Sequence, residues 1–408
     1  MTPNQSSPRI LEELKNGPLG AQVAPYVASL RRQQYADCTI VNHQLVLERF
    51  SRWLRRSKRD VQRIDEATIL QFMKRQRGLP RNARAALIGI LQQLRAAGVT
   101  APAKPIKRSD AQCLVEEYRQ HLLTQRGLTS RTVNSYVPVI GCFLQRLFGK
   151  GPVNVRAVQP ADLEAEMKLC LRLHSRGFAR VVITALRSFL RYLLYNGSVE
   201  TDLTAAVPKV AYWEKCGLPR YLAATEVHRM LDHCERATAL GKRNYAMLLL
   251  LAQLGLRASE LLAVRLDDID WLSGKLRVRS VKDGPQVYVP LPQKAGAALA
   301  SYLRHGRPAC ECREVFVRGK APYVGLACAG DVSNLVRQAL DRAGVKSPCR
   351  GAHVLRHSLA TEMMRQGASL DEIGEILRHR TVASTRVYAK VDVAALRLLA
   401  LPWPGGAR

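Results

Sequence analysis

The stretch "HVLRHSLATEMMRQG", residues 353–367, places two imidazoles and a guanidinium on one face of a predicted helix. His353, Arg356 and His357 are spaced i, i+3 and i+4, so they share a face, while the apolar residues tend toward the others. A guanidinium between two imidazoles favours an anionic ligand. His357 fits equally well as a buried, hydrogen-bonded structural histidine, and this second interpretation is the favoured one.

Two fragments upstream carry further cationic side chains at defined positions. In "GLRASELLAVRLDDID", residues 255–270, Gly255 can end the preceding apolar helix, so that Arg257 stands at the start of the next one. In "RVRSVKDGPQVYVPL", residues 277–291, two alternating strands flank the turn "KDGP" and place Lys282 at a hairpin tip. Each signal is weak alone, because exposed terminal arginines and solvated turn lysines are common.

The downstream fragment "SLDEIGEILRHRTVASTRVYAK", residues 369–390, opens with a capping box and predicts a helix that ends near His379. The segment "TVAST" then leads to a short turn that carries Tyr388. A lone tyrosine is usually part of a core. Because Arg386 and Lys390 flank it, however, we expect the Tyr388 hydroxyl not to be deeply buried.

The composition favours a nucleic-acid partner. The chain has 408 residues, enough for two or three domains, and 63 Lys and Arg against 33 Asp and Glu give a net charge of +30. This surplus is spread along the whole chain, which predicts a long clamp around a polyanion rather than a basic tail. The sequence contains neither a membrane-spanning apolar run nor a secretory signal, so we expect a cytoplasmic or nucleoid-associated protein.

The cysteines predict no metal site. Ten are scattered along the chain, several within helical patterns, which is typical of reduced, intracellular proteins. Cys310 and Cys312 form a C-x-C with Cys328 downstream, but no second pair of ligands completes a zinc set.

Two parts of the N-terminal half resemble each other. "TIVNHQLVLERFSRWL" from Thr39 aligns without a gap with "TVNSYVPVIGCFLQRLF" from Thr132, and "ARAALIGILQQL" from Ala83 aligns with "ARVVITALRSFL" from Ala179. We interpret residues 22–100 and 111–204 as two copies of one small helical domain. The alternative is that two amphipathic helices align through their period alone.

The C-terminal half follows two aperiodic, proline-bearing linkers, residues 100–110 and 205–221. It begins with helical patterns, continues with the hairpin and with "EVFVR", residues 314–318, as a further short strand, and is helical again from Asp331 to Ala400. The predicted fold is therefore mainly α with a small antiparallel sheet. Helical domains precede an α+β domain.

Together, the fragments resemble the tyrosine recombinase (phage integrase) family, whose signature is Arg, Lys, His-x-x-Arg, His or Trp, then Tyr. Order, spacing and context agree from "GLRASEL" through "HVLRHSLAT" and "LDEIGEILRHR" to "TRVYAKV". The resemblance implies the catalytic set Arg257, Lys282, His353, Arg356, His379 and Tyr388. One departure is Arg378, where the family usually has glycine in "LGH".

The resemblance also implies a domain plan. Residues 215–408 correspond to the catalytic domain and residues 111–204 to the helical, SAM-like core-binding domain of the family. Residues 1–105 form an N-terminal helical domain that we interpret as a possible duplicate of the core-binding domain and that lies outside the minimal family plan.

The implied reaction needs neither metal nor cofactor. Tyr388 would attack the phosphorus of double-stranded DNA and form a 3′-phosphotyrosyl bond, while Arg257 and Arg356 hold the non-bridging oxygens. His353 would act as the base, His379 would hydrogen-bond the phosphate, and Lys282 would protonate the departing 5′-oxygen. Strand exchange implies a homotetramer on DNA, alone or shared with sister recombinases. The last predicted helix, residues 392–403, would dock on a neighbouring subunit or on its own domain.

Two other functions fit the same residues. A type IB topoisomerase shares the chemistry but rejoins the same strand, and a regulator of a mobile element would bind DNA without catalysis. Since none of the six signature positions is broken, we expect a recombinase that acts in integration, excision or transposition of a mobile element.

Overall fold

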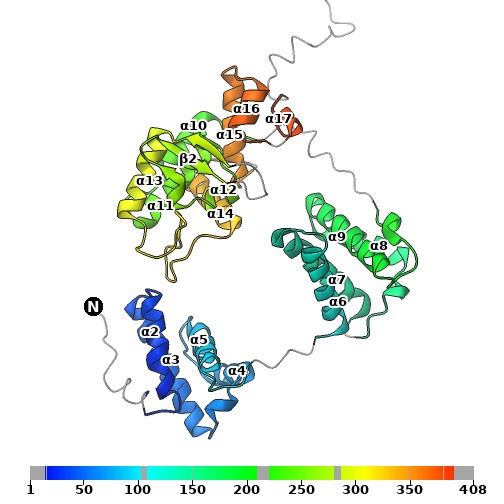
Figure 1. Ribbon diagram of the computed structural model, residues 1–408, viewed down its shortest axis with the longest axis vertical. Helices are drawn as coiled ribbons and strands as arrows, with labels where there is room; N and C mark the ends of the chain where they lie inside the picture. The colour runs from blue at the N-terminus through cyan, green and yellow to red at the C-terminus, as the bar shows by residue number, and fades with distance from the viewer. Residues whose placement is uncertain are drawn as a thin grey trace, which may run out of the picture. The chain divides into compact units, whose positions relative to one another are not determined.

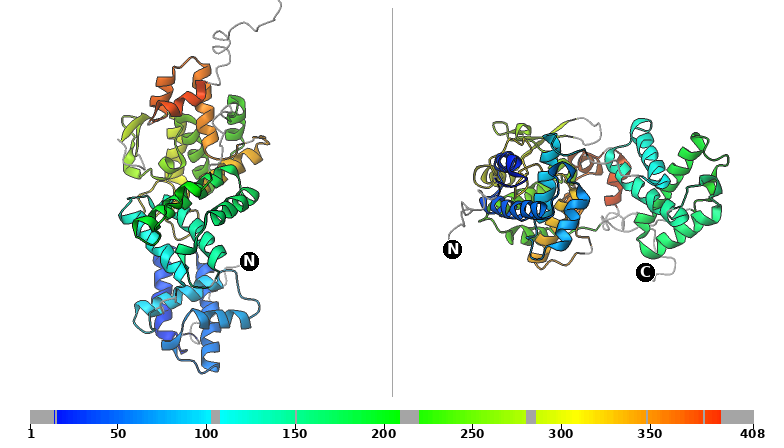
Figure 2. Two further views of the ribbon diagram at one scale, coloured as in Figure 1. Left: turned by 90° about the vertical axis from the view of Figure 1, so that its right-hand side faces the viewer. Right: turned by 90° about the horizontal axis from the view of Figure 1, so that it is seen from below.

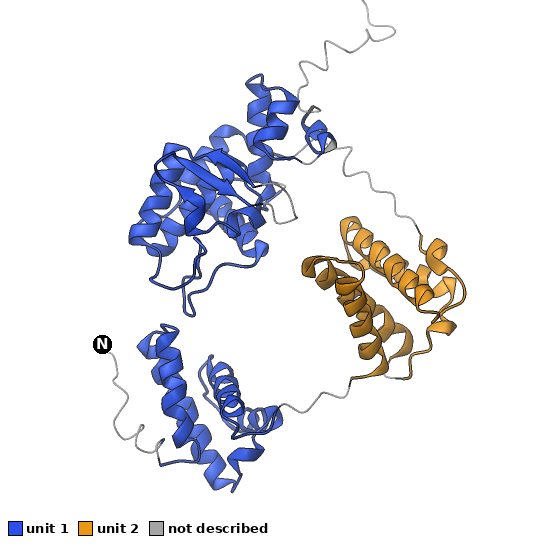
Figure 3. Cartoon of the chain, viewed as in Figure 1, with its two compact units in different colours: residues 1–103, 218–408 blue, residues 104–217 orange. Residues whose placement is uncertain are grey.

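The computed structural model describes residues 14, 16–102, 108–149, 151–208, 220–279, 286–347, 349–379 and 381–389. In these ranges the chain is mainly helical with one three-stranded antiparallel sheet, as the sequence predicts (Figure 1). Residues 104–217 form one compact unit, and residues 1–103 are grouped with 218–408 in the other (Figure 3). Within the described ranges, no helix is long and apolar enough to cross a membrane.

In the part of the chain that the structure describes, the first helical bundle contains four helices and one 3₁₀ turn. In chain order these are α2 (Gly20–Arg32), α3 (Asp37–Arg56), η1 (Val61–Arg63), α4 (Glu66–Arg75) and α5 (Ala83–Ala96). Its core is apolar and partly aromatic: the ring of Phe50 packs on those of Trp53 and Phe72. The bundle therefore has a hydrophobic core of its own.

The second bundle repeats this order of elements (Figures 1 and 2). It consists of α6 (Asp110–Thr124), α7 (Ser130–Phe148), η2 (Val155–Ala157), α8 (Pro160–Leu173) and α9 (Arg176–Tyr195), followed by the turn η3 (Leu203–Ala206). Positions aligned in the sequence are buried in both cores: Leu47 and Phe50 in the first, Ile140 and Phe143 in the second. The shared order and the matching core positions support the duplication, which we keep as a proposal.

The C-terminal part combines helices with a small sheet. Its elements are α10 (Ala224–Asp232), α11 (Ala239–Leu254), α12 (Ala258–Leu262), η5 (Leu266–Asp268), β1 (Ile269–Asp270), β2 (Lys275–Val278), β3 (Val287–Pro290), α13 (Gln293–His305), α14 (Ala329–Arg342), α15 (His353–Arg365), α16 (Leu370–Ile376) and α17 (Val382–Ala389). The leucine-rich helix α11 lies at the centre and contacts α13, α15 and α12. This explains why α11 is apolar around most of its circumference.

Two details of the sheet differ from the sequence-based prediction. Strands β2 and β3 pair in antiparallel register as expected, but the additional strand is β1, and "EVFVR" forms only isolated bridges, such as Arg265 with Glu314. The predicted strand is wrong because the backbone of this segment pairs with two irregular partners: the N–H of Val315 donates to Val264 O at 2.9 Å, and the N–H of Leu326 donates to Phe316 O at 2.9 Å. The hairpin tip, residues 280–285, and the predicted last helix, residues 392–403, lie outside the described residues.

Candidate active site

The turn between α11 and α12 places Arg257. Gly255 caps α11 in the left-handed conformation, with φ +55°, and a Cβ built there would lie 2.6 Å from Cδ2 of Leu377. Only glycine satisfies both conditions without a shift of its neighbours. Arg257 is the N-cap residue of α12, and its backbone N–H donates to the Glu260 carboxylate at 2.9 Å.

Glu260 holds the Arg257 guanidinium as well as its backbone. The carboxylate is buried and forms an ion pair with Nη1 of Arg257, whose side chain is 35% exposed. Burial works to raise the pKa of Glu260, but the Arg257 amide and the charges of Arg378 and Arg257 outweigh it and lower the pKa. The carboxylate is therefore ionised at neutral pH and fixes Arg257 at the surface of the domain.

Arg356 reaches the same place from α15. Its side chain is buried, Nη1 donates to the carbonyl oxygen of Gly255, and Nη2 donates to that of Leu377. Burial, together with the charge of Arg257, lowers the pKa of Arg356 to about 10, so it stays cationic at neutral pH. Each terminal nitrogen carries two N–H groups, which leaves donors for a ligand.

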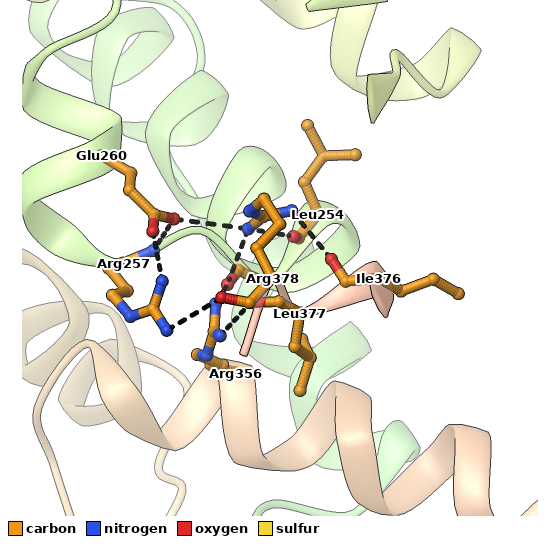
Figure 4. Close-up of polar contacts among 8 residues, drawn as sticks. Leu254, Arg257, Glu260, Arg356, Ile376, Leu377 and Arg378 are labelled. Atoms are coloured by element: carbon orange, nitrogen blue, oxygen red, sulfur yellow. Dashed lines mark hydrogen bonds and ion pairs between the residues drawn. The ribbon is translucent and has the colours of Figure 1, made fainter. Parts of the chain in front are cut away.

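A third arginine, Arg378, joins this pair (Figure 4). Residue 378 follows the C-cap of α16 with φ +55°, and its Nη2 forms an ion pair with Glu260 at 3.3 Å. Its carbonyl oxygen accepts a hydrogen bond from Nη2 of Arg257 at 3.4 Å. Two of these guanidinium groups pair with one carboxylate, and the third, that of Arg356, lies beside them, which leaves a positive surplus suited to a phosphate.

Tyr388 is buried, contrary to the sequence-based expectation. It lies in α17 rather than in a turn, is 2% exposed, and packs with Ala360, Ile373 and Leu377. The prediction was wrong because the polar neighbour Arg386 is exposed on another face of the same helix, so flanking charge says little about the tyrosine ring.

The Tyr388 hydroxyl is hydrogen-bonded to Nδ1 of His357 at 2.8 Å. Burial raises the pKa of Tyr388, although the charges of Arg356 and Arg257 act against this. Burial, together with His353 and Arg356, lowers the pKa of His357. A neutral phenol therefore faces a neutral imidazole, which is the arrangement that a proton transfer requires.

His379 covers the other side of the tyrosine. Its ring stacks parallel to that of Tyr388, with centroids 6.2 Å apart, and its Nδ1 is 2.8 Å from the hydroxyl oxygen of Thr385. Burial is the largest cause that lowers the pKa of His379, followed by Arg356 and Arg257, and the result is about 4. His379 is therefore neutral and held by Thr385 in one orientation.

His353 and Lys282 complete the predicted set. His353 is exposed at the start of α15, and its ring centroid lies 6.4 Å from that of His357. The imidazole that is hydrogen-bonded to the Tyr388 hydroxyl belongs to His357, whereas the family resemblance implies His353 as the base. Lys282 lies outside the described residues.

Sequence reasoning did not place three residues of this arrangement in the site. The sequence places Glu260 only within its helix, favours a structural role for His357, and marks Arg378 as a departure from the family pattern. The spacing of Glu260 three residues after Arg257 is a capping-box pattern and could have indicated their contact. Nothing in the local sequence indicates the contacts of Arg378 with Leu254 and Glu260, because these partners lie more than 100 residues away.

Comparisons with known proteins agree with this geometry. Residues 220–394 match the phage integrase family. A proposed integrase/recombinase of Sinorhizobium fredii, y4rA, is 40% identical over 396 residues, which is 96% of both chains. The tyrosine recombinase XerD of Mycobacterium tuberculosis is 31% identical over 69% of this chain and 94% of its own length. The chain belongs to the phage integrase family. It is a tyrosine recombinase.

Solved structures of this family share the fold. XerH bound to its palindromic difH substrate, in a post-cleavage complex, has a TM-score of 0.55 and 18% identity over 88% of this chain and 95% of its own. A lambda integrase tetramer bound to a Holliday junction has a TM-score of 0.53 and 18% identity over 76% of this chain and 87% of its own. At this level of identity the similarity concerns the fold alone.

Proposed function

We propose that this recombinase cleaves and rejoins double-stranded DNA at a specific site, in the integration, excision or transposition of a mobile element. The observation that carries the proposal is the meeting of Arg257, Arg356, His379 and Tyr388 in one positively charged cluster. The net charge of +30 and the DNA-bound relatives support DNA as the substrate.

The reaction is a transesterification at phosphorus. The Tyr388 oxygen forms a bond to phosphorus, the bond from phosphorus to the 5′-oxygen breaks, and a 3′-phosphotyrosine and a 5′-hydroxyl result. Arg257 and Arg356 donate to the non-bridging oxygens, where negative charge increases in the transition state. The ester bond is conserved, so a 5′-hydroxyl of a second duplex can reverse the step without an energy source.

Specific side chains accept and donate the protons of the cleavage step. His357 accepts the phenol proton of Tyr388, and His353 is the next imidazole toward solvent. His379 donates a hydrogen bond to the phosphate through the nitrogen that Thr385 does not occupy. Lys282 supplies the proton that the departing 5′-oxygen takes up.

The proposed oligomeric state and cellular location follow from the proposed recombination. Exchange between two duplexes requires four active sites, so we propose a homotetramer on DNA, alone or with sister recombinases, in the bacterial cytoplasm at the nucleoid. We also propose the domain plan of residues 1–105, 111–204 and 215–408. The separate cores of the two helical bundles support its first boundary.

Sequencing of protein-bound DNA ends tests the function. The enzyme is incubated with genomic DNA of its source, the complexes are denatured, and DNA ends linked to protein are sequenced. We expect 3′-linked ends that gather at one short sequence, and exchange between two plasmids that carry it. Relaxation of any plasmid without such a sequence would identify a topoisomerase instead, and absence of linked ends would identify a regulator.

A further inference from the structure

Arg378 occupies a backbone position that favours glycine. The N–H of Arg378 donates to Glu375 O at 2.9 Å, and that of His379 donates to Gly374 O at 2.8 Å. These two bonds form a Schellman motif, in which residue 378 takes the left-handed conformation with φ +55°. A non-glycine residue is strained there, and the surrounding structure must offset the cost of that backbone conformation.

The guanidinium of Arg378 joins three elements. Nη1 donates to Ile376 O at 2.8 Å, and Nη2 lies 3.2 Å from Leu254 O and 3.3 Å from the Glu260 carboxylate. Figure 4 shows Arg378 lying between Arg257 and the end of α11. The side chain, 10% exposed, thus ties the loop that carries His379 to the end of α11 and to α12.

The ion pair between Arg378 and Glu260 also changes the electrostatic potential of the site. Glu260 lies against Arg257, so alone it would cancel much of the positive potential that Arg257 offers to a phosphate. Arg378 binds the same carboxylate from the other side. The charges of Arg257 and Arg356 then stay available for the scissile phosphate and for the charge that develops on it.

We infer that Arg378 is a positioning residue for strand cleavage: it offsets the buried charge of Glu260 and fixes Arg257 and the His379 loop around the phosphate. The inference rests on the proposed function. It gives a chain-specific role to a position where the backbone alone would favour glycine.

The test compares rates of adduct formation in a single turnover at saturating DNA, on a nicked suicide substrate. Arg378→Gly relieves the backbone and removes the cation, so a purely structural view predicts a rate equal to or above that of the wild type. We expect instead a decrease on the order of 10- to 100-fold, as for small misplacements of catalytic groups. Gln34→Gly is the matched control, because Gln34 also has positive φ, at +59°, but lies in the first bundle.

Two further measurements separate positioning from folding. On a substrate whose scissile phosphate carries a methyl group in place of one charged oxygen, the defect of Arg378→Gly should shrink, since less negative charge needs stabilisation. Glu260→Gln in the Arg378→Gly background should recover part of the rate, because it restores the net charge of the cluster.

The outcomes are distinct. Wild-type rates for Arg378→Gly, or an equal defect on both substrates with no recovery by Glu260→Gln, would overturn the inference. A wild-type enzyme that forms no adduct on any substrate would refute the proposed function itself.

Discussion

The fold changes the ionisation of His379 strongly. Its pKa falls from the ordinary value of 6.5 to about 4, through burial first and then through the neighbouring arginines. Between these two values the unfolded chain binds a proton that the folded chain does not. The folded state therefore loses stability as the pH falls from about 6.5 toward 4.

We predict that His379→Asn weakens this pH dependence. Asparagine cannot titrate but can still hydrogen-bond the Thr385 hydroxyl, which lies 2.8 Å from the imidazole. Urea unfolding at pH 7, 5.5 and 4.5 should show a steeper fall of the midpoint for the wild type than for the variant. Because other histidines contribute equally to both proteins, parallel pH profiles would contradict the pKa assigned to His379.

The proposed role of Lys282 as general acid can be tested by changing the leaving group of the substrate. A general acid is dispensable when the departing atom needs no proton, as with sulfur in place of the bridging 5′-oxygen. Lys282→Ala should cleave the normal substrate slowly and the sulfur substrate well, whereas Arg257→Ala should be slow on both. Lys275, exposed at the start of β2, provides the control, and equal rescue of Lys275→Ala would show that another residue is the acid.

At the scale of the elements, the link between α11 and α12 places a strict steric requirement on its sequence. Gly255 combines a left-handed backbone with close approach to Leu377 and Leu359, whereas Gly274, with φ +60°, has no atom within 4 Å of its virtual Cβ. Both alanine variants carry the backbone strain, roughly 1–2 kcal/mol. Only Gly255→Ala adds overpacking, typically about 1–3 kcal/mol.

We therefore predict that Gly255→Ala lowers the free energy of unfolding more than Gly274→Ala does, and that it alone slows adduct formation. The reason is that the Gly255 carbonyl also anchors Arg356. Chemical denaturation and the suicide-substrate assay measure the two effects. Equal stability of the two variants would mean that Leu377 moves aside without an energetic cost.

Local sequence patterns predicted those elements that depend on neighbouring residues alone. Helical period, the glycine after Leu254 and the capping box at Ser369 gave α11, α12 and α16. The strand at "EVFVR" was wrong because the segment forms only isolated bridges, with Arg265 and Gly325, and a local apolar run cannot reveal its pairing partners. The burial of Tyr388 and its contact with His357 depend on the packing of α15, α16 and α17, which no local pattern encodes.

At the scale of the whole molecule, the positive charge is distributed over separate parts. In the first bundle, the helix α3 carries exposed arginines at positions 49, 52, 55 and 56. Three of them, Arg49, Arg52 and Arg56, are spaced along one side of the helix. If this bundle contacts DNA, these side chains bind its phosphates.

We predict that deletion of residues 1–105 weakens DNA binding and flattens its salt dependence. The slope of log affinity against log salt should decrease by about 0.9 for each phosphate that these residues neutralise. Replacement of Arg49, Arg52 and Arg56 by glutamine should also flatten the slope, although this variant keeps the first bundle.

Fluorescence anisotropy with labelled DNA measures both salt dependences, over a range of roughly 50 to 200 mM salt. An unchanged slope after the deletion would assign the first bundle to contacts between subunits.

Tyr388 is assigned as the nucleophile, and one substitution tests this assignment most directly. Tyr388→Phe removes the hydroxyl but keeps the ring that packs on His379 and the apolar cluster, and it removes no positive charge. On a nicked suicide substrate resolved on a denaturing gel, the wild type should form a covalent adduct, and the variant should form none while binding DNA with nearly unchanged affinity. A covalent adduct that persists in Tyr388→Phe would contradict the assignment.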